Sequence, residues 1–342
     1  MPMNTPTRGD VHVNKPLTSI SIAYLQESDL FLADRVFPNI PVQKQSDRYF
    51  FYDKGDWLRN NVRRRGPNTE SSGSGFRVDN TPTYFCDVWA VHKDVDDQLR
   101  ANQDSPIDMD RDATRWVTQQ LAQRRDIEWA SSYFQEGVWS NEVAGVGSDP
   151  DDGQFLRWDE DGSKPIVDLR KQIVERASET GFRMNCAVLG ARVWATLSDH
   201  DDFLDRIKYT QGPAIVTPDL LAQVLELDEV LVSWAVMSSS AAGHGEYGEA
   251  EAANEDVDFI FPDAVGLFYR PASASVLQPS AGYTFSWQGY LGAGDQGNRI
   301  REFRMENLAS DRIEGEMAFD LKQVSPDLGT FFKDAIDSGG EE

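Results

Sequence analysis

Two aromatic segments joined by a long polar connection constrain this chain more than any other feature. Residues 48–53 (RYFFYD) and 83–91 (TYFCDVWAV) have the aromatic and β-branched content of strands. The chain between them contains three consecutive arginines over 63–65 and a flexible Ser/Gly run over 71–75, and it is much longer than a compact hairpin turn. Because a two-stranded ribbon is marginally stable alone in water, we expect a projection that a neighbouring subunit completes. A disordered basic loop is the alternative interpretation.

The projection is basic although the chain as a whole is acidic. The net charge of the chain is −24, whereas residues 46–85 contain seven Lys and Arg against five Asp and Glu. An acidic surface repels phosphate backbones, which argues against sequence-specific nucleic-acid binding. A basic projection is instead a natural partner for an acidic patch on the next copy of the chain. We expect it to contact that copy through Arg48, Lys54, Arg59, Arg63, Arg64, Arg65, Glu70 and Arg77.

The first 45 residues have the composition of an arm rather than of a domain. Five prolines interrupt them, and residues 36–42 (VFPNIPV) must be extended because a residue before proline avoids the helical region. One short amphipathic segment lies at 20–33. We expect this arm to order by lying on another surface, with a frayed terminus as the alternative. Its expected intersubunit contacts are Tyr24, Phe31 and Phe37.

A long helix is predicted over 106–136. Ser105 is a suitable N-cap and Pro106 suits the first helical position. Apolar residues then recur at helical spacing as far as Phe134, and Gly137 is the expected stop. At 1.5 Å per residue such a helix is ~45 Å long, so we expect it to support the other layers of the fold.

An α/β section and a strongly β segment follow the helix. A connection rich in glycine and acids covers 140–163. Beyond it, helices are predicted over 164–180 (stopped by Gly181), 191–197, 202–209 and 218–225, and strands over 186–189, 229–236, 257–261, 266–270, 283–291, 299–307 and 312–324. The predicted fold class is α+β.

No segment carries a specific catalytic or ligand-binding motif. Residues 292–297 (GAGDQG) have the glycine spacing of the dinucleotide-binding fingerprint. Polar and apolar residues alternate over 298–305, however, which indicates a strand where that fingerprint requires a helix. Residues 199–202 (DHDD) are interpreted as a solvated helix start rather than a metal site, and Cys86 and Cys186 as small buried hydrophobes. We expect no catalytic, cofactor-binding or metal-ligating residue, although the many acids leave an unrecognised acid pair open.

The sequence also indicates the cellular compartment in which the protein is made. No run approaches the ~20 apolar residues that span a bilayer, and residues 1–16 lack the apolar centre of a signal peptide. We expect a protein that is made in a cytosol and does not contact a membrane.

The order of these features resembles that of the HK97-type major capsid proteins of tailed bacteriophages. The amino-acid sequences of five segments add to the resemblance. It covers nearly the whole chain, although no single stretch is a diagnostic motif. The five segments are 40–56, 66–75 (GPNTESSGSG), 85–94 (FCDVWAVHKD), 104–112 (DSPIDMDRD) and 313–319 (IEGEMAF). The resemblance implies a non-enzymatic subunit of a virion shell, assembled in the host cytoplasm. It implies an N-terminal arm over 1–45, an extended loop over 46–85, a peripheral domain over 86–163 with a spine helix at 106–136, an axial domain over 164–295, further peripheral strands over 296–324 and a C-terminal tail over 325–342.

The implied partners are further copies of the chain, in hexamers and pentamers of a closed icosahedral shell that holds double-stranded DNA. A separate scaffolding protein, a portal and a decoration protein belong to the same expectation, and a cofactor does not. Some relatives cross-link through a lysine of the extended loop. Lys54 is the only lysine of 46–85, and since we find no matching acid and asparagine partners, we predict no cross-link.

Two other functions stay open at this point. An encapsulin, the shell protein of a cellular nanocompartment, shares the fold. A soluble α/β enzyme with an unrecognised acid pair would be a monomer or a small oligomer with a deep polar pocket. The capsid interpretation predicts projecting arms and no such pocket.

Overall fold

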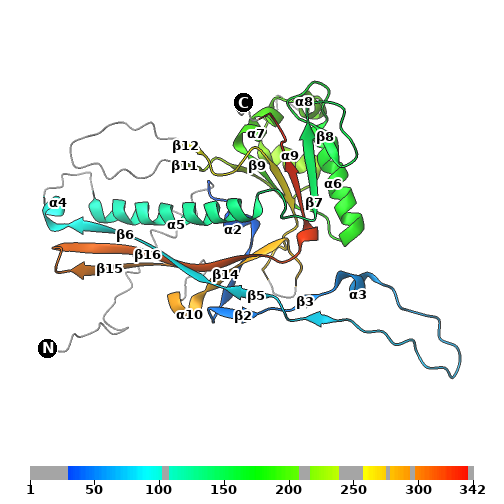
Figure 1. The fold of residues 1–342 in the computed structure, drawn as a ribbon, viewed down its shortest axis with the longest axis horizontal. Coiled ribbons are helices and arrows are strands. Elements are labelled where there is room, and N and C mark those ends of the chain that lie inside the picture. Colours follow the sequence, from blue (N-terminus) through cyan, green and yellow to red (C-terminus); the bar gives the residue numbers. More distant parts are fainter. Residues whose placement is uncertain are drawn as a thin grey trace.

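The computed structural model describes residues 30–101, 108–207, 216–238, 257–274, 278–292 and 297–337. These residues form a five-stranded sheet, a six-stranded sheet and a long loop that projects away from both (Figure 1). The predicted α+β class is therefore confirmed.

The five-stranded sheet is built around one long strand, β16, which pairs with β6, β14 and β15 in antiparallel orientation. The fifth strand, β1, lies parallel to β14 and brings the N-terminal segment into the sheet. The strand bounds are β1 Asn39–Val42, β6 Asp87–Asp96, β14 Gly282–Trp287, β15 Asn298–Met305 and β16 Ser310–Gln323.

The six-stranded sheet has the spatial order β10-β9-β13-β17-β7-β8 and mixes parallel with antiparallel pairs. Helices α6, α7, α8 and α9 pack with it around a core that includes Trp158, Trp194 and Phe332. The bounds are β7 Asn141–Val146, β8 Gln154–Leu156, β9 Cys186–Gly190, β10 Glu229–Ser233, β13 Val265–Phe268, β17 Gly329–Lys333, α6 Pro165–Thr180, α7 Ala191–Ser198, α8 Asp201–Ile207 and α9 Pro218–Leu225.

The predicted long helix is α5, Met109–Tyr133. The carboxylate of Asp108 accepts a hydrogen bond of 3.2 Å from the backbone N–H of Arg111 and so caps its first turn. The predicted cap at Ser105 and Pro106 lies outside the described residues.

Helix α5 ends earlier than predicted and lies along β16. Its C-cap is Phe134 rather than a residue next to Gly137, because the Phe134 ring turns into the core, where it is 1% exposed. A Cβ atom on Gly315 would lie 2.3 Å from Cγ1 of Val117 and 2.9 Å from Cδ1 of Leu121. Glycine at 315 therefore lets the helix approach the sheet closely.

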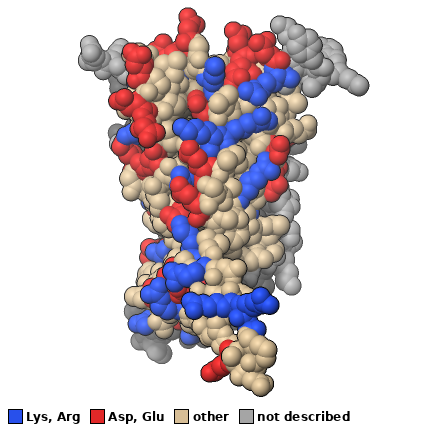
Figure 2. Space-filling model, turned by 90° about the vertical axis from the view of Figure 1, so that its right-hand side faces the viewer, with Lys and Arg blue, Asp and Glu red and all other residues tan. Residues whose placement is uncertain are grey.

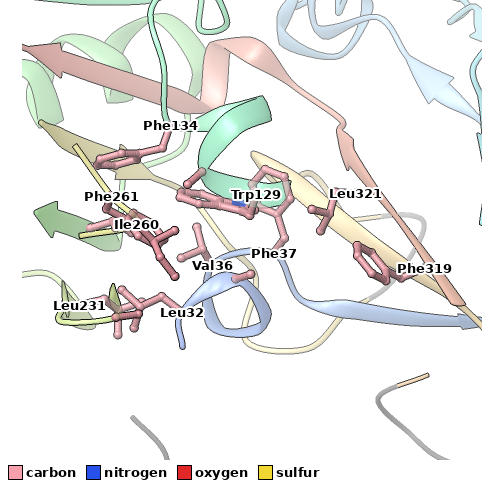
Figure 3. Packing of buried hydrophobic residues seen from close by; sticks show 14 of the residues in the cluster. Leu32, Val36, Phe37, Trp129, Phe134, Leu231, Ile260, Phe261, Phe319 and Leu321 are labelled. Atoms are coloured by element: carbon pink, nitrogen blue, oxygen red, sulfur yellow. The ribbon is translucent and has the colours of Figure 1, made fainter. Parts of the chain in front are cut away.

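The largest core cluster joins residues that are distant in sequence (Figure 3). Leu32 and Phe37, from the N-terminal segment, pack with Trp129 of α5. Leu231 of β10 and Phe319 of β16 belong to the same cluster. The cluster therefore ties the N-terminal segment, α5 and strands of both sheets together.

The loop over 46–85, called the projecting loop from here on, contains two short antiparallel ribbons. β2 (Ser46–Arg48) pairs with β5 (Thr83–Phe85), and β3 (Phe51–Tyr52) pairs with β4 (Val78–Asp79). The predicted strand at 48–53 is thus split in two, and a short helix that we did not predict, α3 (Lys54–Leu58), follows it. Asp53 caps α3, since its carboxylate accepts a hydrogen bond of 2.9 Å from Gly55 N–H.

Several short elements complete the described residues. Two of them, β11 and β12, form an antiparallel hairpin next to α5 (Figure 1). The bounds are α2 Ala33–Val36, α4 Asp97–Ala101, β11 Val236–Ser238, β12 Val257–Phe259, α10 Gln288–Leu291 and the 3-10 turn η1 Pro326–Leu328.

The structure corrects the expected C-terminal tail. Residues 329–333 form β17, which lies between β13 and β7 inside the six-stranded sheet. The five-residue segment GTFFK is too short to show a clear periodicity, so the sequence did not reveal this strand. The predicted strand at 283–291 is also shorter, because residues 288–291 form α10.

Sheet membership also crosses the boundaries expected at 163/164 and 295/296. β7 and β8 precede residue 164 but belong to the six-stranded sheet, whereas β14 precedes residue 296 but belongs to the five-stranded sheet.

Among the described helices, none is long and apolar enough to cross a bilayer.

Candidate intersubunit surfaces

The projecting loop is held in shape by one of its own arginines. Nη2 of Arg77 lies 2.7 Å from Oδ2 of Asp53, and both the backbone N–H and Nε of Arg77 donate to Oδ2 of Asp56, at 3.0 and 3.2 Å. These hydrogen bonds lower the pKa of Asp56 and keep its carboxyl ionised. Arg77 therefore braces the two sides of the loop.

A lysine joins the projecting loop to the body of the same chain. Nζ of Lys54 lies 2.5 Å from Oδ2 of Asp327, in η1. Lys54 and Arg77 were both expected to contact a neighbouring copy. The structure engages both with carboxylates of their own chain, which fixes the direction in which the loop leaves the body.

The other predicted contact residues of the projecting loop remain exposed. Among the described residues, none forms an ion pair with the side chains of Arg48, Arg59, Arg63, Arg64, Arg65 or Glu70, and Arg65 donates only to the backbone carbonyl of Thr69. In Figure 2, Lys and Arg side chains gather toward the lower end, where the projecting loop leaves the body, and Asp and Glu crowd the upper end. These cations are available to acids outside the described chain.

Aromatic side chains of the projecting loop form a cluster that faces solvent. The ring centroids of Tyr52, Trp57 and Phe76 lie 5.4 to 6.0 Å apart, yet Trp57 is 62% exposed and Phe76 57%. We did not predict Trp57 and Phe76 as contact residues. The sequence feature that could have revealed them is the presence of two aromatic residues in an otherwise polar segment. Exposed aromatic clusters of this kind mark interaction surfaces.

The arm residues behave differently from the prediction. Phe37 is fully buried and its ring packs against Trp129 and Tyr133, with centroids 5.6 and 5.0 Å away. The expectation that Phe37 contacts another subunit is therefore wrong, because its own core encloses it. Phe31 is partly buried against the same core, so its contact stays a prediction, and Tyr24 lies outside the described residues.

Helix α5 anchors the start of the described chain. The carboxylate of Asp126, which is 1% exposed, accepts hydrogen bonds from Leu32 N–H at 2.8 Å and Ala33 N–H at 2.9 Å. It thereby caps the short helix α2 in place of a local side chain. Arg125 adds an ion pair to Asp34. Burial raises the pKa of Asp126 to about 7.

An acidic surface lies at the end of the molecule opposite the projecting loop (Figure 2). Exposed acids are frequent in the two turns that flank β8, with Arg157 and Lys164 as their nearest cations in sequence. The acids are Asp149, Asp151, Asp152, Asp159, Glu160 and Asp161.

The geometry around His200 gives no support to catalysis there. Nδ1 of His200 accepts a hydrogen bond of 3.0 Å from Asp202 N–H, so the proton of the neutral ring is on Nε2, 2.9 Å from Oγ of Ser163. An imidazole that donates to a serine cannot act as its general base. Within the described part of the chain, no three His, Cys, Asp or Glu residues are grouped to hold a metal ion.

The other sequence candidates are structural. Residues 298–305 form β15, so no helix follows the GAGDQG segment, of which residues 293–296 lie outside the described chain. Cys86 and Cys186 are both buried, as predicted, and burial raises the pKa of each thiol to about 12.

The fold is that of the HK97-type capsid and encapsulin proteins. A phage-related protein from Bordetella bronchiseptica superimposes with a TM-score of 0.70 at 20% identity, covering 95% of this chain and 98% of its own. The capsid of cyanophage P-SCSP1u gives 0.55 at 11% identity over 86% of this chain and 85% of its own. An encapsulin from Synechococcus elongatus gives 0.53 at 11% identity over 100% of this chain and 95% of its own.

Sequence comparison gives two relatives over nearly the full length. The chain is 24% identical to the major capsid protein of Pseudomonas phage JBD67 over 95% of this chain and 97% of the relative. It is 23% identical to the major capsid protein of Burkholderia phage BcepMu, over 93% and 94%. No family model matches the chain. The resemblance to HK97-type capsid proteins is confirmed.

Proposed function

We propose that this chain is the major capsid protein of a tailed phage and assembles into the icosahedral head shell around a double-stranded DNA genome. Relatives of this name align over nearly the whole length, and the fold is shared with phage capsids. The observation that carries the proposal is the projecting loop, which holds its aromatic cluster and its unpaired arginines out in water. Such a surface costs solubility in a monomer and is useful only when another copy covers it.

The proposed domain roles follow the resemblance with adjusted bounds. Residues 1–31 act as the N-terminal arm and 46–85 as the extended loop over the neighbouring copy, whereas α2 and β1, which were expected in the arm, belong to the peripheral domain because they lie in its core and its sheet. The peripheral domain comprises the five-stranded sheet with α5 as its spine, and the axial domain comprises the six-stranded sheet with α6 to α9. This assignment moves β7, β8 and β17 to the axial domain and β14 to the peripheral domain, in agreement with sheet membership.

The proposed partners are copies of the chain in hexamers and pentamers, with a separate scaffolding protein, a portal and a decoration protein. We place the protein in the virion shell after assembly in the host cytoplasm, and we propose a structural role without enzymatic activity. The acidic surface around β8, if it faces the genome, would let packaged DNA slide without binding. A calculated potential of the assembled shell with a basic interior would contradict that placement.

The encapsulin alternative shares the fold but has less support. The encapsulin superimposes with a TM-score of 0.53 against 0.70 for the phage-related protein, and both full-length curated relatives are phage capsid proteins. The soluble-enzyme alternative, which assumes an unrecognised acid pair, also has less support, because both full-length curated relatives are named major capsid proteins.

Negative-stain electron microscopy of the purified chain, alone and coexpressed with neighbouring genes, tests the proposal. Closed shells or tubes are expected. The triple variant Arg63→Glu, Arg64→Glu, Arg65→Glu should leave the subunit folded and abolish the shells, because three cations of the loop become anions on an acidic chain. The matched triple Lys variant keeps the charge and should still assemble. Small uniform particles under every condition would refute the capsid function.

A further inference from the structure

Helix α6 presents two valines to solvent on the side that faces away from its sheet. Val167 and Val174 are 45% and 67% exposed, whereas Ile166, Leu169 and Ile173 are buried in the core of the six-stranded sheet. The two exposed valines are seven residues apart, so they lie on one stripe of the helix, two turns and ~10 Å from each other. Valine is a weaker helix former than the residues that are usual at exposed helical positions, so helix formation does not account for this stripe.

An open groove of about 470 Å³ lies between α6 and α8, at the upper right of Figure 1, and the valine stripe forms part of its wall. It is called the α6 groove from here on. Its lining combines two apolar, three cationic and one acidic side chain, which are Val167, Arg170, Lys171, Val174, Glu175 and Arg206. This local excess of cations stands against the net charge of −24 of the whole chain and indicates an acidic partner.

Arg206 is held at the α8 side of the groove before any partner binds. Its Nε and Nη2 donate to Oδ1 of Asp202, at 3.2 and 3.1 Å. The other oxygen of Asp202, Oδ2, accepts a hydrogen bond of 3.2 Å from Ile166 N–H at the start of α6. One carboxylate therefore ties Arg206 to both helices, and this wall has a defined position, which lowers the entropic cost of docking.

The two cations of α6 keep donors available for another molecule. Nη2 of Arg170 donates a hydrogen bond of 2.5 Å to the carbonyl of Val224 in α9, and no carboxylate of the described residues forms an ion pair with Arg170. Lys171 approaches only Glu175, at 4.0 Å, and its side chain is 60% exposed. An exposed pair at this distance contributes little. Both cations can therefore bind carboxylates from outside the described chain.

An amphipathic helix with acidic flanks fits the α6 groove. Val167 and Val174 have the seven-residue spacing of one position in a helix–helix seam, and Lys171 lies beside that seam, where a partner helix carries its flanking charges. Apolar side chains of the partner cover the valines, and its Asp and Glu pair with Arg170 and Lys171. Nucleic acid fits less well, because Glu175 repels phosphates and the valines find no counterpart in a phosphate backbone.

The described part of this chain supplies no helix of that kind. Of its helices with eight or more residues, only α5 and α6 expose a large apolar side chain. On α5 this residue is Trp116, and its neighbours one turn further along are Gln119 and Gln120 rather than acids. A separate protein is therefore the better source of the occupant.

We propose that the α6 groove is the docking site for an acidic amphipathic helix of a separate protein that takes part in assembly. This inference rests on the proposed shell function, which includes such proteins but assigns none of them a surface. The valine stripe buries the apolar side of that helix, and the cations of the groove select its acidic flanks.

Site-specific photocross-linking of the full chain tests the proposal. The variant Val174→p-benzoylphenylalanine is coexpressed with the neighbouring genes and irradiated before and after shells form. We expect a covalent adduct with a separate protein, through a segment in which Asp and Glu flank apolar residues at helical spacing, and mass spectrometry identifies that segment. The matched control is Val88→p-benzoylphenylalanine, at an exposed valine of β6, which should not give this adduct.

An adduct with another copy of the chain or with nucleic acid would overturn the proposed docking site. The absence of any adduct beyond the control, in samples that contain shells, would overturn it as well and leave the shell function standing. Absence of shells from the wild-type chain coexpressed with its neighbouring genes would instead contradict the shell function itself.

Charge reversal in the same system gives a second measurement. Arg170→Glu with Lys171→Glu should remove the Val174 adduct, because the groove then repels an acidic helix, whereas Arg170→Lys with Lys171→Arg keeps the charge and should retain it. Lys171→Glu alone, at an exposed position, should weaken the adduct even if the double variant does not fold. The matched control Lys93→Glu with Arg111→Glu reverses two exposed cations elsewhere and should leave the adduct intact. An adduct of equal yield from the folded reversed variants would contradict the proposal.

Discussion

Replacing Phe37 by alanine should destabilise the subunit itself, not merely its assembly. The ring is fully buried against Trp129 and Tyr133, and a Cβ on Gly282 would lie 2.3 Å from its Cζ, so the surroundings fit the ring closely. Burying about 150 Å² of ring at about 25 cal/mol per Å² is worth about 4 kcal/mol. Core Phe→Ala changes cost about 3–5 kcal/mol, and we expect a loss in that range.

Urea unfolding of the unassembled subunit, followed by tryptophan fluorescence, measures this loss. Trp129 contacts the ring directly, so the fluorescence of the folded state should change as well. Phe31→Ala is the matched control, because Phe31 is only partly buried against the same core and its loss should cost clearly less. A loss below about 1 kcal/mol for Phe37→Ala, or equal losses for both variants, would refute burial of Phe37 in its own subunit.

Three further predictions concern buried groups. Burial raises the pKa of Asp126 to about 7, above the ordinary value of 3.8 in the unfolded chain. The stability of the subunit should therefore fall as the pH rises between these values, by at most about 1.4 kcal/mol per pH unit. Asp126→Asn should flatten this slope in urea titrations, and an unchanged slope would contradict the raised pKa. Gly315→Ala should cost about 1–3 kcal/mol by forcing α5 away from β16, which thermal unfolding would detect, and a stability equal to wild type would show that Val117 can yield. Neither Cys86 nor Cys186 should react with a thiol reagent at pH 8 until the chain is denatured, since burial raises both pKa values to about 12; rapid labelling of the native protein would contradict their burial.

Local sequence signals predicted the elements with strong periodicity. The apolar spacing of α5 placed that helix to within a few residues, and Gly181, with a φ of +77°, ends α6 where predicted. The long polar connection between aromatic strands correctly indicated a projection. Elements without periodicity were missed. They include β7 and β8, which lie inside the connection expected at 140–163, and β17, α2 and α3, because runs of three to six residues look alike in strands, turns and short helices.

The candidate surfaces were predicted only in part. The excess of arginines placed a basic surface on the projecting loop, but the sequence could not show that Arg77 and Lys54 are engaged by acids of their own chain. The exposed apolar side chains at β11–β12 gave no signal either. Trp234 and Val236 have the composition of a buried strand, and only the register and their exposure reveal an uncovered face.

The sequence by itself determined the order of the elements, the α+β class and the basic character of the projecting loop, because these depend on residue type and on spacing over a few turns. Only the tertiary structure decided which residues face water. Phe37 and Trp57 are both aromatic and both stand near prolines or glycines, yet one is fully buried and the other is 62% exposed. The difference comes from α5, about ninety positions further along the chain, whose Trp129 packs against the Phe37 ring and whose Asp126 holds the backbone of Ala33. Burial depends on such long-range contacts, which no local pattern records.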